Sequence, residues 1–140
     1  MFWDSSAVVP VLVTELQSAP MATLLRADPG LVLWWASSVE CQSAVFRRHR
    51  EGELPLSALN EALVRLKALV DNADVVAPTD RVRERAGRLL AAHPLRAGDA
   101  LQLAAALIWC NETPQGDSFV SLDDRLREAA RREGFALVPG

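Results

Sequence analysis

The sequence has only two cysteines, no CxxC pair and no long segment rich in glycine, serine or proline. Cys41 and Cys110 lie far apart without a nearby histidine pair, which argues against a zinc site or a disulfide framework. We expect both thiols to be reduced and at least partly buried. Without a linker-like segment, residues 1–140 should form one ordered domain, and the 50% of residues that are hydrophobic suffice for one core.

Long apolar runs are also missing. The longest, near residues 100–110, is about half of the ~20 residues that a membrane-spanning helix needs. The first ten residues lack the basic start of a signal peptide. We therefore expect a cytoplasmic protein with no membrane partner. No glycine-rich phosphate loop is present, which disfavours nucleotide-cofactor chemistry.

The sequence also lacks an excess of positive charge. The net charge of −3 and the pI of about 5.4 do not suit a protein that holds nucleic acid through its overall charge. The arginines are nevertheless clustered, at residues 47–50, 81–88 and 125–132. Each cluster is open to two interpretations, a local nucleic-acid contact or a solvated helix face paired with glutamates of the same helix.

Strand-like apolar runs alternate with segments of helical spacing along the whole chain. The expected strands are Phe2–Trp3, Leu31–Trp35, Ala73–Ala77, Ser118–Leu122 and Phe135–Val138. The expected helices are Ser5 or Ser6 to Leu16, Ala19–Ala27, Ser37 or Ser38 to Arg50, Pro55–Val70, Asp80–Ala92, Asp99–Cys110, and Asp123 or Asp124 to Glu133. This alternation predicts an α/β fold with a mostly parallel sheet and helices on both faces.

Four acidic residues stand at equivalent ends of these units. Asp4, Glu40 and Asp123 follow predicted strands or lie in the first turn of the next helix, and Asp99 opens a helix. The carboxyl ends of parallel strands share one edge, where ligands bind. Clustered carboxylates repel one another unless a cation neutralises them, and oxygen ligands without His or Cys select Mg²⁺ or Mn²⁺. Such a metal can activate water and neutralise a phosphate, as phosphodiester hydrolysis requires.

Each acid also has a purely structural explanation, because a carboxylate in the first turn caps the helix and interacts with its dipole. That explanation does not account for four acids at equivalent ends. It is strongest at the last position, where Asp123 and Asp124 are adjacent. The alternation of a strand favours Asp123, which shares a face with Phe119 and Ser121.

Other polar and aromatic residues are weaker candidates. Arg96 could bind phosphate with its planar guanidinium or form a salt bridge to a neighbouring acid. His49 and His93 are disfavoured as catalytic groups, because a metal-activated water removes the need for an imidazole. The tryptophans are expected in the core or at a dimer contact rather than as base-stacking platforms: Trp3, Trp34, Trp35 and Trp109.

The segments around the four acids resemble the PIN-domain family. They are Phe2–Ala7 (FWDSSA), Ser38–Glu40 (SVE), Leu95–Ala104 (LRAGDALQLA) and Phe119–Asp123 (FVSLD). Their order and spacing match across essentially the whole chain, and the third segment is the most specific. At this length the chain resembles the toxin of a type II toxin–antitoxin pair, of the VapC-like type.

That resemblance implies a three-layer α/β/α sandwich, a homodimer, and Mg²⁺- or Mn²⁺-dependent endoribonuclease activity that a cognate antitoxin inhibits by laying its tail across the active site. Carried over residue by residue, the catalytic and metal-binding positions are Asp4, Glu40, Asp99 and Asp123. Ser121 matches the Ser or Thr that often accompanies the last acid. Many relatives have a single Asp where this sequence reads Ser-Leu-Asp-Asp, so Asp124 is the alternative fourth acid.

Two rival functions come from other classes. One is a catalytically silent PIN-like interaction domain, in which the acids cap helices and the amphipathic helix 55–70 binds a partner. The other is a phosphotransfer enzyme with Asp4 as nucleophile, which would want a second Asp where Ser6 stands. The sequence leaves open which RNA is cut.

Overall fold

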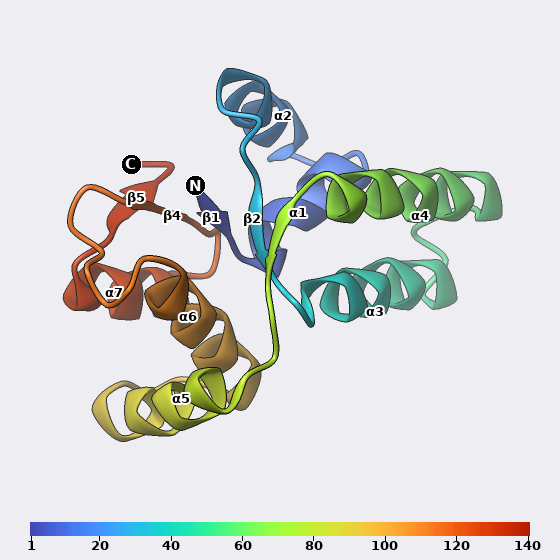
Figure 1. Cartoon of the computed structure of the whole chain (residues 1–140). Coiled ribbons are helices and arrows are strands. Elements are labelled where there is room, and N and C mark those ends of the chain that lie inside the picture. The colour runs from blue at the N-terminus through green and yellow to red at the C-terminus, as the bar shows by residue number, and fades with distance from the viewer.

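The computed structural model describes residues 1–140 and contains five strands and seven helices in alternating order (Figure 1). The strands are β1 (Phe2–Trp3), β2 (Val32–Trp34), β3 (Asp74–Val76), β4 (Ser118–Val120) and β5 (Ala136–Val138). The helices are α1 (Ser5–Leu12), α2 (Ser18–Ala27), α3 (Ser37–Arg50), α4 (Leu56–Asp71), α5 (Asp80–Ala92), α6 (Ala97–Trp109) and α7 (Asp124–Glu133).

The strands form one parallel sheet in the order β3-β2-β1-β4-β5, which places the first strand at the centre. Phe2 of β1 lies opposite Val32 of β2 on one side and Phe119 of β4 on the other. The chain therefore builds outward from β1 to β3, crosses back, and continues on the other side with β4 and β5. The strand order reverses between β1 and β4, where α/β sheets usually bind their ligands.

Helices cover both faces of the sheet, because successive strand residues point to opposite sides. Phe2 and Phe119 belong to a core of 18 buried residues shared with α5, α6 and α7. Trp3 and Val120 belong to a core of 15 buried residues shared with α1, α3 and α4. Figure 1 shows the two groups of helices on opposite sides of the strands. The expected α/β class and the three-layer arrangement are confirmed.

Helix α1 differs from the sequence-based expectation at both ends. Its N-cap is Asp4, not a serine, because Asp4 is extended and its carboxylate accepts a hydrogen bond from the Ser6 N–H. The helix ends at Leu12, not at Leu16. Val13 is extended, and its carbonyl oxygen accepts a hydrogen bond of 2.7 Å from the Ser18 hydroxyl, which closes the turn into α2.

Trp35 lies outside the core, the first of the two locations expected for the tryptophans. Strand β2 ends one residue before it, and 59% of the Trp35 side chain is exposed, whereas Trp3 and Trp34 are buried. The apolar run Leu31–Trp35 therefore combines a buried strand with one solvent-facing residue. Both cysteines are free and buried, as expected. No helix combines the length and the apolar character that crossing a membrane would require.

Candidate functional site

The four acids converge on one edge of the sheet, although they come from four separate parts of the chain. Asp4 follows β1 directly, and its N–H donates to the Val120 carbonyl of β4 at 3.0 Å. Asp123 follows β4 and therefore lies beside Asp4 at the switch point. Glu40 lies in the first turn of α3, just past β2, and Asp99 lies in the first turn of α6.

Ser6 ties Asp4 to the exit of β4. The Ser6 hydroxyl donates to Asp4 Oδ2 at 3.0 Å and accepts a hydrogen bond of 2.8 Å from the Leu122 N–H. Asp4 itself is only 3% exposed. Its position is thus fixed by the α1 cap on one side and by the β4 loop on the other.

Asp123 and Asp124 have different surroundings. The Asp123 carboxylate caps α7 by accepting from the Leu126 N–H at 2.9 Å, and the Asp123 N–H donates to the Ser121 hydroxyl at 3.1 Å. Asp124 is the first residue of α7, is exposed, and forms no side-chain hydrogen bond or ion pair. The structure therefore orients Asp123 and leaves Asp124 free.

Gln102 is a site residue that the sequence analysis missed. It is 1% exposed, and its amide nitrogen lies 3.1 Å from Glu40 Oε1, 2.8 Å from the Ser5 hydroxyl and 3.0 Å from the Ser37 hydroxyl. It therefore links α6 to α1 and α3 and orients the Glu40 carboxylate. The available signal was position: Gln102 is the only polar residue between Asp99 and Cys110, and it lies one helical turn after Asp99.

The carboxyl groups disfavour one another's charge. Burial raises the pKa of Asp4 to about 6, hydrogen bonds from Ser121 and Ser6 oppose this rise, and the Asp123 charge adds a smaller contribution to it. Burial also raises the pKa of Glu40, with further contributions from the charges of Asp4 and Asp99. The pKa of Asp99 is raised by burial and by the charge of Asp123. Every one of the four acids thus lies within electrostatic reach of another.

The donor set fits a hard divalent cation. No three His, Cys, Asp or Glu side chains form a ready-made shell for a metal ion. Mg²⁺ does not need one, since it usually takes one or two carboxylates and keeps several waters. The oxygen-only donors and the mutual repulsion of the acids fit a Mg²⁺ or Mn²⁺ ion coordinated in this way.

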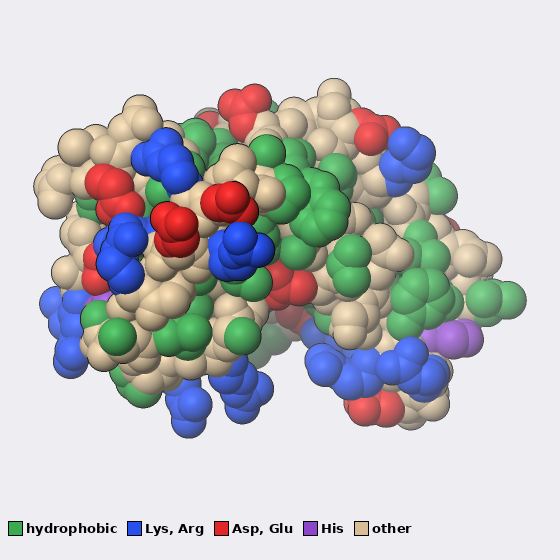
Figure 2. Space-filling model, turned by 60° about the horizontal axis from the view of Figure 1, so that its bottom comes forward, with side chains coloured by type: hydrophobic (Ala, Val, Ile, Leu, Met, Phe, Trp, Pro, Cys, Tyr) green, Lys and Arg blue, Asp and Glu red, His purple; other side chains and the backbone are tan.

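Arginines stand beside the acids, whereas the histidines are engaged elsewhere. Arg96 and Arg125 lie close enough to Asp99 for their charges to lower its pKa, in opposition to burial and Asp123. Figure 2 shows acidic side chains inside a notch between two lobes, with Lys and Arg side chains on both rims. His93 is buried, with Nε2 2.7 Å from Glu133 Oε2, and His49 Nδ1 lies 2.7 Å from the Leu54 carbonyl oxygen.

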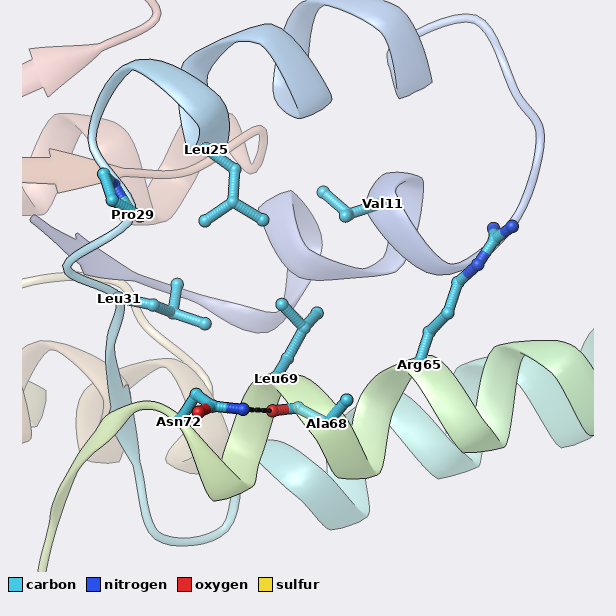
Figure 3. Close-up of a pocket in the computed structure, with 8 residues that line it drawn as sticks. All are labelled: Val11, Leu25, Pro29, Leu31, Arg65, Ala68, Leu69 and Asn72. Atoms are coloured by element: carbon cyan, nitrogen blue, oxygen red, sulfur yellow. Dashed lines mark hydrogen bonds between the residues drawn. The ribbon is translucent and has the colours of Figure 1, made fainter.

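A largely apolar hollow lies apart from the acids. It has a volume of about 360 Å³ between α1, α2 and α4 (Figure 3). Figure 3 shows Leu25, Leu31 and Leu69 pointing into it, with Arg65 at one end. None of its lining residues is acidic, so it does not belong to the candidate site.

Comparisons with known proteins agree with this fold. The sequence profile of the PIN domain matches residues 1–132. Among solved structures, the crystal structure of PAE2754 from Pyrobaculum aerophilum is similar, with a TM-score of 0.63 and 19% sequence identity over 98% of this chain and 87% of that chain. At that identity the likeness concerns the fold alone. No curated protein matches the sequence significantly.

Proposed function

Because the chain belongs to the PIN domain family, we propose that it is a metal-dependent endoribonuclease that hydrolyses RNA phosphodiester bonds. PIN domains are generally nucleases and commonly use divalent metals. The observation that supports the proposal is that each of the four carboxyl groups lies within electrostatic reach of another and that three of them have raised pKa values. Capping alone would not require the four acids to come together.

In this proposal Asp4, Glu40, Asp99 and Asp123 hold Mg²⁺ or Mn²⁺. The bound cation supplies an activated water and neutralises the negative charge that develops on the phosphate. Gln102 holds the Glu40 carboxylate in place, and Ser6 does the same for Asp4. Asp123 is preferred to Asp124 because its carboxylate is oriented by α7 and acts electrostatically on both Asp4 and Asp99.

Purified protein is expected to degrade single-stranded RNA when Mg²⁺ or Mn²⁺ is present and to stop when a chelator removes it. Gel analysis of end-labelled RNA would show internal cuts rather than stepwise loss from one end. Calorimetry should also detect saturable Mn²⁺ binding without any RNA. RNA that stays intact under all these conditions, together with no Mn²⁺ binding, would favour the alternative, a catalytically silent interaction domain.

The biological role that we propose is that of a toxin in a toxin–antitoxin pair, acting as a homodimer and inhibited by a cognate antitoxin. The support is the resemblance to VapC-like toxins and the apolar surface that the α3–α4 hairpin leaves exposed. Val64 and Leu56 on α4 are 71% and 60% exposed, and Val39 on α3 is 66% exposed. We propose that these side chains contribute to the antitoxin interface.

Val64→Glu is expected to weaken antitoxin binding at least about tenfold without reducing RNA cleavage, because an unpaired charge buried in an interface costs more than about 1.4 kcal/mol. The measurement is light scattering and titration with the small protein encoded by the neighbouring gene. Arg65→Glu is the matched variant, since Arg65 lines the apolar hollow of Figure 3 instead. A complex that survives Val64→Glu but not Arg65→Glu would place the partner in that hollow.

A further inference from the structure

Two polar hollows flank the acids. The first, here called the α3 hollow, has a volume of about 340 Å³ and is lined by Ser5, Ser6, Glu40, Arg47 and Arg48 among others. The second, here called the α7 hollow, has a volume of about 360 Å³ and is lined by Arg96, Asp99, Asp123, Asp124 and Arg125. Glu40 thus faces one hollow, and Asp99 and Asp123 face the other.

Each hollow contains an arginine that is free to bind an anion. In the α3 hollow, Arg48 is paired with Glu15 at 2.6 Å, whereas Arg47 is exposed and has no ion pair or side-chain hydrogen bond. In the α7 hollow, neither Arg96 nor Arg125 forms such a contact, although acids lie close by. A free guanidinium suits two oxygens of one phosphate.

The charge balance of the molecule makes these arginines necessary for a nucleic-acid substrate. The net charge is −3 and the site is acidic, so the protein as a whole repels a phosphate backbone. Local cations are therefore needed to offset this repulsion for a strand that crosses the site. The structure places such cations on both sides of the acids.

We propose that the two hollows form one substrate track, in which Arg47 binds a backbone phosphate on one side of the cleaved bond and Arg96 and Arg125 bind phosphates on the other. The inference rests on the proposed nuclease function and adds its substrate geometry. A strand held on both sides is cut internally.

The test is binding of a short fluorescein-labelled single-stranded RNA, followed by anisotropy at several salt concentrations in chelator, so that no cleavage occurs. Arg47→Ala and Arg125→Ala are each expected to weaken binding several-fold. Each should also reduce the steepness of the plot of the log binding constant against the log salt concentration by about 0.7, the value for one lost phosphate contact on a single strand. The double variant should lose about twice that slope, because the contacts lie in separate hollows.

Arg88→Ala is the matched control. Arg88 is an exposed arginine of α5 without an ion pair, and it lines neither hollow. Its loss removes the same charge from the molecule and should leave the slope unchanged. Equal effects of Arg88→Ala and Arg47→Ala, or no effect of either track variant, would overturn the proposal.

Cleavage assays with Mn²⁺ separate the track from the nuclease function. Track variants that cut RNA with a raised KM and a nearly unchanged kcat support both. If the wild type cuts no RNA but the track variants bind RNA more weakly than the wild type does, the substrate track is supported and the nuclease function is contradicted. Normal binding and cleavage by both variants contradicts the track alone.

Discussion

Replacing Asp4 with asparagine is expected to lower the rate of RNA cleavage by at least about 100-fold, the upper end of the loss seen when only an outer-shell partner of a metal site is removed. Asparagine keeps the shape of the side chain and can still accept the Ser6 N–H, so the cap of α1 should persist. It removes the charge that a hard cation needs. Because Asp4 is buried, the unfolding free energy without metal should stay equal or rise.

The same change at Asp99 is expected to have the same effect on cleavage. Asp123→Asn and Asp124→Asn, made singly, identify the fourth acid: the first should inactivate and the second should leave most activity. Urea unfolding in chelator gives the stability of each variant. Asp4→Asn and Asp99→Asn proteins that cut RNA as fast as the wild type would refute the site assignment, and the interaction-domain function would take its place.

The second large effect is a loss of stability in the metal-free protein as the pH rises from about 4 to about 6. The ordinary pKa of Asp4 is 3.8, and burial raises it to about 6 in the folded chain. The folded state therefore binds this proton more tightly than the unfolded state. The contribution of the proton to the unfolding free energy is fully present below pH 4 and is lost by about pH 6. Two pKa units correspond to roughly 3 kcal/mol. The raised pKa values of Glu40 and Asp99 also lower the stability of the metal-free protein as the pH rises.

Urea unfolding in chelator at pH values from 4 to 7 measures this loss. The difference between the wild type and Asp4→Asn isolates Asp4 from exposed groups such as Glu128, whose pKa is lowered to about 2 by Arg131 and Arg132. Adding Mn²⁺ should restore stability above pH 6, because the cation binds the ionised folded state. If the difference in unfolding free energy between the wild type and Asp4→Asn does not change between pH 4 and 6, burial is not the cause of a raised Asp4 pKa.

Local signals made most of the fold predictable. Thr79 caps α5 through its hydroxyl, and Gly134 ends α7 with a φ of 111°, a conformation that glycine adopts without strain. Such signals depend on a few neighbouring residues and can be read from one sequence. The end of α1 could not be read in this way, because it depends on the turn that Ser18 closes. The exposure of Trp35 could not be read either, because it depends on where β2 ends in the folded chain.

The same distinction applies to the candidate site. Each acid became a candidate because it follows a strand or opens a helix, which is a local pattern. The role of Gln102 was missed because its partners Ser5 and Glu40 lie 97 and 62 residues away in the sequence. The orientation of Asp123 likewise depends on contacts at the end of β4 that only the folded chain provides.

The central place of β1 also sets the order in which the candidate site can be assembled during synthesis. Strand β1 is made first, yet its neighbour β4 and the Leu122 N–H that binds Ser6 come from a segment more than 110 residues later. Long-range pairings of this kind form late in folding. Until Ser118–Asp123 has left the ribosome, the centre of the sheet has only one partner and Asp4 lacks its neighbour Asp123. Under the proposed function, an unfinished chain therefore lacks a complete site and does not yet cleave RNA.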